Sequence, residues 1–163
     1  MTDPEKRVDR FMTKYSAEVA ELGRAAYGKL RALIPSATVL VYDNYNALAI
    51  GFGPGERASE AILSVVLYPR WVSLFFLQGA KLPDPGRLLT GSGKQARHRV
   101  LPDADELDRP EVRALIATAL DRAKVPIDPG AEGRVIIKSA SATQRPRRPA
   151  AKTTKPAAKR GRR

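Results

Sequence analysis

Short apolar runs, rich in β-branched and aromatic residues and separated by turn residues, fill the middle of the 163-residue chain. The runs cover residues 38–42, 47–52, 61–67, 71–77 and 95–101. Residues of these types favour strands, and a polar turn such as Asp43-Asn44-Tyr45-Asn46 between two runs favours a hairpin. We therefore expect an antiparallel sheet of about five strands, with residues 134–138 as a candidate for a further edge strand.

A helical pattern stands on each side of these runs. Apolar residues recur every three or four positions from Val8 to Leu33, after Thr2 or Asp3 as cap and before the stop at Ile34-Pro35. A second such pattern begins at Asp108 and ends before Pro126. We therefore expect an α+β fold, in which an antiparallel sheet is flanked by an N-terminal and a C-terminal helix.

The end of the chain has a different composition. Residues 144–163 hold nine Lys or Arg, three Pro and no acidic residue, whereas residues 1–143 hold twenty basic and seventeen acidic residues. Most of the net charge of +12 therefore lies at the C-terminus. Cations separated by Pro, Ala and Thr cannot bury a core. We predict a globular domain over residues 1–140 and a disordered basic tail over residues 141–163.

This tail is the strongest indication of a partner. Its cations would neutralise phosphates of DNA or RNA without reading sequence, as in the tails of linker histones, which this segment resembles. The residues assigned to nucleic-acid binding are Arg145, Arg147, Arg148, Lys152, Lys155, Lys159, Arg160, Arg162 and Arg163. The alternative is a solubilising extension without a specific partner. The first interpretation predicts a cytoplasmic protein associated with the nucleoid.

Several functional classes lack the residues they need. The chain has no cysteine, so it has no disulfide partner and no thiolate metal site, and its single histidine, His98, supports no Ser-His-Asp triad. No apolar run approaches the roughly 18 residues of a membrane span. The residues indicate no catalytic group, metal site or cofactor, which favours a non-enzymatic protein.

One loop and one turn are candidates for a pocket that binds a small anion or nucleotide. The Gly91-Ser92-Gly93-Lys94 loop would let backbone amides approach an anion, although its spacing is not that of a Walker loop and a plain turn is the alternative. The pocket would combine Asp43, Asn44 and Tyr45 with Lys94, Arg97 and Arg99.

The residues around this pocket have simpler interpretations too. Alternation along a strand places Arg97 and Arg99 on one face and His98 on the other, which favours His98 as a hydrogen-bonded core residue. Trp71, Phe75 and Phe76 have the chemistry to stack on bases, but aromatic clusters of this kind are usually core. We therefore expect all three to be buried.

Three segments together resemble a known family. They are the run Gly91-Ser-Gly-Lys-Gln-Ala-Arg-His-Arg-Val-Leu101, the helix ending in Leu-Ile-Pro35, and the hairpin at Tyr42-Asp-Asn-Tyr-Asn-Ala47. They resemble the bacterial YdhG-like domains of unknown function, over about residues 8–125. The resemblance implies an antiparallel sheet flanked by helices, with an outline similar to frataxin.

Some members of that family have been discussed as iron chaperones, which implies an alternative function. The domain would then bind a small molecule or a metal ion, and the tail would only set its location. Frataxin-type iron binding relies on converging carboxylates, because hard cations need several oxygen ligands. The first helix argues against it, since Asp9, Glu18 and Glu21 are interleaved with Lys14 and Arg24.

Overall fold

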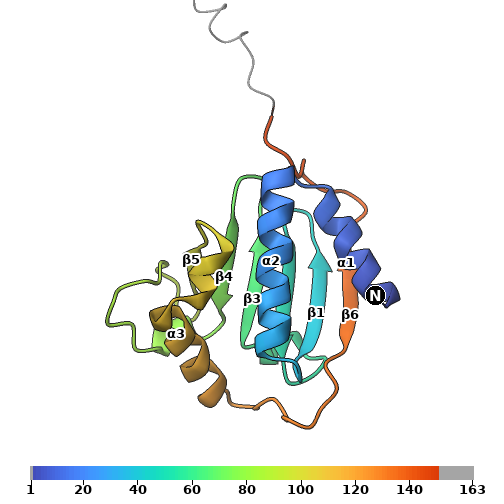
Figure 1. The fold of residues 1–163 in the computed structure, drawn as a ribbon. Coiled ribbons are helices and arrows are strands. Elements are labelled where there is room, and N and C mark those ends of the chain that lie inside the picture. Colours follow the sequence, from blue (N-terminus) through green and yellow to red (C-terminus); the bar gives the residue numbers. More distant parts are fainter. Residues whose placement is uncertain (1, 151–163) are drawn as a thin grey trace, which may run out of the picture.

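The computed structural model describes residues 2–150. This part of the chain has an α+β fold of three α-helices and a six-stranded sheet, shown in Figure 1. The helices are α1 (Asp3–Thr13), α2 (Ala17–Leu33) and α3 (Pro110–Asp121). The strands are β1 (Thr38–Asp43), β2 (Leu48–Gly53), β3 (Leu63–Leu67), β4 (Val72–Phe76), β5 (Arg97–Val100) and β6 (Val135–Ala140).

The sheet is mixed, with the strand order β5-β4-β3-β2-β1-β6. Strands β1 to β5 form the expected antiparallel meander, but β6 pairs with β1 in parallel. The prediction of about five antiparallel strands is therefore wrong in strand number and direction. The reason is the long connection after α3, which returns the chain to the far edge of the sheet (Figure 1). The candidate edge strand at 134–138 is confirmed.

The N-terminal helical pattern belongs to two helices, not one. The chain leaves the helix at Lys14, and Ser16 caps α2 by accepting a hydrogen bond from the Val19 amide. Between them Tyr15 is buried, and its hydroxyl donates a hydrogen bond to the Leu67 carbonyl at 3.0 Å. Because both helices pack on the same core, the apolar spacing continues across the break and conceals it. Thr2 is the cap of α1, as expected, and Glu5 completes a capping box with it.

The three helices lie on one face of the sheet, and the core lies between them (Figure 1). Alternate strand residues such as Ile50, Val65 and Leu74 point into this core and are fully buried. Gly23 allows α2 to approach β3 closely, since a Cβ there would lie 2.6 Å from Leu67 Cδ2. No helix within residues 2–150 has the length and hydropathy needed to cross a membrane.

No α-helix of the described chain covers the opposite face of the sheet, which we call the open face. The connection between β2 and β3 crosses one end of it. Gly53 permits this crossing, because a Cβ there would lie only 3.0 Å from the Ala61 Cα. The segment after β6 lies at the other end, near the turn between β1 and β2. Between these two segments Ala49, Ser64 and Phe75 of the open face are partly exposed.

Candidate functional site

The segment that follows β6 is attached to the domain. The backbone amide of Ser141 donates to the Asp43 carbonyl at 2.8 Å, and the amide of Arg145 donates to the Tyr45 carbonyl at 2.9 Å. The Gln144 side chain adds a hydrogen bond to the Asp43 carbonyl at 3.0 Å. Ordered structure therefore continues past residue 140, where we had placed the end of the globular domain. The expected tail residues from Ala151 onward lie outside the described residues.

Arg147 anchors this segment in the domain. Only 5% of the residue is exposed, and its guanidinium lies 2.8 Å from Asp43 Oδ1. It also donates to the carbonyls of Asn44 and Tyr45 and lies over the Tyr15 ring. A buried charge is stable only when it is paired, so Arg147 depends on Asp43 as its counter-charge. From the sequence we expected Arg147 to bind phosphate. In the structure it pairs with Asp43 and holds the C-terminal segment against the domain.

Asp43 is the carboxylate on which the anchor depends. It is buried, and besides Arg147 it accepts a hydrogen bond from Lys14 Nζ at 2.6 Å. Burial by itself would raise the pKa of Asp43, but the hydrogen bonds from Lys14, Gln144 and Arg147 outweigh burial and lower it. Asp43 therefore stays ionised and joins α1, β1 and the C-terminal segment, instead of facing a ligand.

Acidification should weaken this anchor. A carboxyl group whose folded-state pKa is lowered stabilises the fold above its unfolded pKa of about 3.9, and this contribution is lost as the pH falls through the folded value. We expect the urea midpoint of the wild type to fall between pH 5 and pH 3. The fall should be shallower in Asp43→Asn, which cannot titrate at this position. Equal pH dependence in the two proteins would contradict the assignment.

The structure does not bring the two halves of the predicted anion pocket together. Asp43, Asn44 and Tyr45 lie at the β1–β2 turn, whereas Lys94, Arg97 and Arg99 lie on or next to β5, at one edge of the sheet. Strands β3 and β4 lie between the β1–β2 hairpin and β5. Strand order depends on long-range pairing, which the local pattern did not reveal.

The two arginines of β5 already have partners. Arg99 Nε lies 2.6 Å from Glu106 Oε2, and Glu106 is buried. Arg97 donates to the carbonyls of Gly93 and Ala96. Both arginines lie on the helix-covered face, because they pair across the sheet with the core residues Phe76 and Leu74.

His98 is not in the core as expected. It lies on the open face, where its ring stacks on Phe75 with 5.0 Å between ring centroids. Val100, on the same side of β5, is 48% exposed. The alternation along this strand was predicted correctly, but the assignment of its faces was reversed. On the covered face Glu106 supplies a counter-charge to Arg99, whereas Arg97 is bonded to backbone carbonyls.

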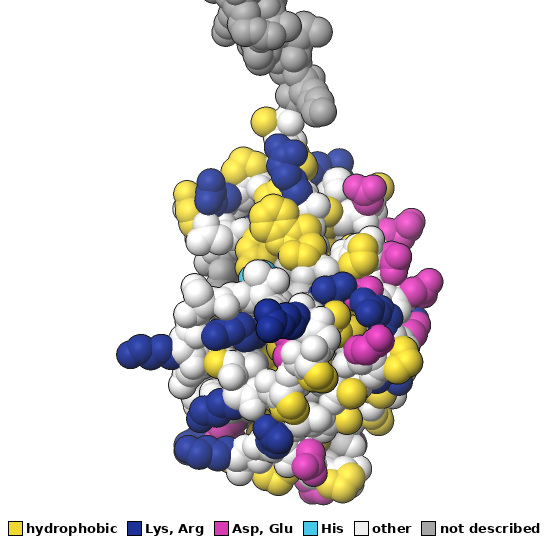
Figure 2. All heavy atoms as spheres, turned by 90° about the vertical axis from the view of Figure 1, so that its left-hand side faces the viewer, with side chains coloured by type: hydrophobic (Ala, Val, Ile, Leu, Met, Phe, Trp, Pro, Cys, Tyr) yellow, Lys and Arg dark blue, Asp and Glu magenta, His cyan; other side chains and the backbone are white. Residues whose placement is uncertain are grey.

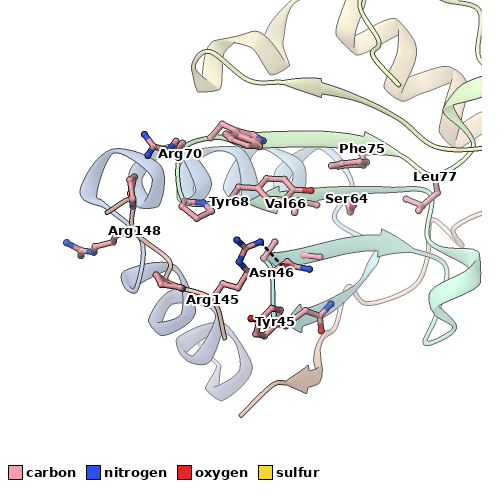
Figure 3. Close-up of a pocket in the computed structure, with 17 residues that line it drawn as sticks. Tyr45, Asn46, Ser64, Val66, Tyr68, Arg70, Phe75, Leu77, Arg145 and Arg148 are labelled. Atoms are coloured by element: carbon pink, nitrogen blue, oxygen red, sulfur yellow. Dashed lines mark hydrogen bonds between the residues drawn. The ribbon is translucent and has the colours of Figure 1, made fainter. Parts of the chain in front are cut away.

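A groove of about 1040 Å³ runs along the open face. Its floor is formed by small and apolar side chains of β2, β3 and the end of β4, among them Ala49, Ser64, Val66 and Leu77. Figure 3 shows the β1–β2 turn and the C-terminal segment along one side, with Tyr45 and Arg145, and the β3–β4 hairpin along the other. The anchored segment is therefore a wall of the groove.

Seven of the seventeen residues that line the groove are aromatic or basic. The aromatic residues are Tyr45, Tyr68, Trp71 and Phe75, and the basic residues are Arg70, Arg145 and Arg148. No Asp or Glu is among the described residues that line the groove. In the view of Figure 2, hydrophobic side chains gather next to Lys and Arg near the top of the molecule, while Asp and Glu gather along the right-hand edge.

We expected Trp71, Phe75 and Phe76 to be buried in the core. Only Phe76 is. Trp71 is 43% exposed, and Phe75 lies on the open face beside His98. Side chains alternate between the two faces along a strand, so the sequence already placed Trp71 and Phe75 on one face and Phe76 on the other. The missing information was which of the two faces the helices cover.

Comparisons with protein-family models, with curated proteins and with solved structures give no match for this chain. The YdhG-like resemblance therefore stays a prediction. Within residues 2–150 no group of three acidic or histidine side chains is placed to hold a metal ion. In the acidic stretch before α3, Asp108 is paired with Lys29 and Arg113.

Proposed function

We propose that this protein binds nucleic acid without sequence specificity, through the phosphate backbone and through the basic residues at its C-terminus. The binding residues are Arg145, Arg148, Lys152, Lys155, Lys159, Arg160, Arg162 and Arg163. We do not include Arg147, which we had expected to bind nucleic acid, because Asp43 neutralises its charge. Binding of this kind would associate the protein with the nucleoid or with RNA in a bacterial cytoplasm.

The observation that carries the proposal is the anchored root of the basic segment. Arg147 holds the chain against the domain, while Arg145 and Arg148 on either side of it are exposed and line the groove. The six remaining cations follow in sequence without any intervening acidic residue. A phosphate chain that meets these cations is therefore held beside the open face.

The expected affinity is modest. Sequence-independent binding by clustered cations has dissociation constants of about 10⁻⁴ to 10⁻⁶ M at physiological salt. The proposal assigns no reaction to the chain. The alternative, binding of a small molecule or a metal ion such as iron, rests on the family resemblance alone, because no described cluster of side chains favours it.

Salt dependence tests the proposal. Each phosphate contact on duplex DNA contributes about 0.9 to the slope of log K against log salt concentration, so eight cations set a limit of about 7. We expect fluorescence anisotropy of a labelled duplex with the full chain to give a slope steeper than about 3. Binding without salt dependence, or no binding at 50 mM salt, would contradict phosphate recognition.

A further inference from the structure

We infer that the groove on the open face binds unpaired bases, so that single-stranded nucleic acid is the preferred partner. This inference rests on the proposed function and adds to it a second element of recognition. The basic residues would hold the phosphates, and the groove would hold the bases. The two elements meet at Arg145 and Arg148, which belong to both.

The aromatic side chains of the open face form two stacked or tilted pairs. The rings of Tyr68 and Trp71 have centroids 5.1 Å apart, and Phe75 stacks on His98 at 5.0 Å. Trp71 is 43% exposed, and Tyr45 on the opposite wall is 50% exposed. Large flat side chains in these positions offer π-faces to an incoming base. Stacking of a base on an aromatic ring contributes about 1–3 kcal/mol and tolerates any sequence.

The shape of the groove favours a single strand. Its lining includes Trp71, Phe75 and Leu77, and the stretch from Trp71 to Leu77 along β4 is about 20 Å long at about 3.3 Å per residue. This length accommodates a few nucleotides laid across a pleated surface. Bases in a duplex are stacked inside the double helix and cannot reach aromatic rings on the face of a sheet, so a duplex can only contact the arginines.

Charge selects a polyanion over the other possible occupants. The lining carries Arg70, Arg145 and Arg148 and, among its described residues, no carboxylate. A second copy of the chain in a two-fold interface would bring two sets of these three arginines into one interface with no carboxylate from either groove, which is unfavourable. An acidic peptide would satisfy the charges but would supply no flat partner for Trp71 and Phe75.

Trp71 is the only tryptophan in the chain, so its fluorescence reports directly on the groove. We expect short unstructured DNA and RNA oligonucleotides to quench it when added to the full chain, and the same sequence as a duplex to leave it nearly unchanged. Equal quenching by DNA and RNA indicates that the sugar is not read, and a difference identifies the preferred nucleic acid. Both results support binding of bases.

Two variants extend the test to affinity. Trp71→Ala and Phe75→Ala should each weaken single-strand binding by about fivefold or more, as measured by anisotropy, and leave duplex binding unchanged. Val125→Ala is the matched control, because Val125 is 42% exposed and lies outside the groove. The urea midpoint of each variant reports whether it is folded, and Trp71→Phe should restore most of the affinity.

Several results would overturn the inference. One is equal affinity of the wild type for single strands and duplex, and another is wild-type affinity in both alanine variants. The others are competition by polyglutamate as strong as by DNA, and a dimer in which Trp71 is shielded.

Different results would contradict the proposed function. Loss of the salt slope refutes phosphate binding by the basic residues, whereas failure of the groove alone leaves duplex binding and its salt slope intact.

Discussion

Replacing Asp43 by alanine should lower the free energy of unfolding by about 3–5 kcal/mol, because it leaves the Arg147 guanidinium buried without its counter-ion. The substitution also removes the acceptor of Lys14, which bonds Asp43 at 2.6 Å. Urea unfolding followed by circular dichroism, with linear extrapolation to water, measures the loss. The expected effect is large because both side chains of the pair are almost fully buried.

An exposed ion pair provides the matched control. Arg134 and Glu56 lie 3.0 Å apart, but their side chains are 60% and 57% exposed. Surface pairs of this kind contribute about 0–1 kcal/mol, so Glu56→Ala should have little effect. Similar small losses in Asp43→Ala and Glu56→Ala would show that Arg147 is not the anchor of the C-terminal segment.

The strands of the meander could be predicted from local pattern, because β-branched runs and polar turns encode hairpins directly. β6 could be placed only as a candidate edge strand, since its partner and direction depend on a connection that crosses the molecule. The break at Tyr15 was also missed. Tyr15 continues the apolar spacing while its hydroxyl bonds Leu67, a contact distant in sequence.

The functional residues show the same division between local and long-range information. Composition identified a basic C-terminus, but all its cations looked equivalent, and only the fold distinguishes Arg147 from Arg145 and Arg148. Alternation separated Trp71 and Phe75 from Phe76. It did not tell which of the two faces the helices would cover, so the exposed aromatic residues were assigned to the core.

Neutralising the basic residues beyond the anchor should abolish most of the binding to duplex DNA. The variant changes Lys152, Lys155, Lys159, Arg160, Arg162 and Arg163 to glutamine in the full chain. Six phosphate contacts contribute up to about 5 to the slope of log K against log salt concentration. The variant should therefore lose most of this slope and most of its affinity at 50 mM salt. The anchor formed by Asp43 and Arg147 is not altered by these changes.

The most direct measurement compares this variant with one of equal charge, by anisotropy across a salt series. The control changes six exposed cations that form no side-chain ion pair within residues 2–150: Lys6, Arg10, Arg57, Lys81, Lys94 and Lys124. We predict that the C-terminal variant loses most of its salt slope and that the control keeps it. Equal losses in the two variants would show that net charge alone attracts the polyanion and would contradict binding by the C-terminal segment.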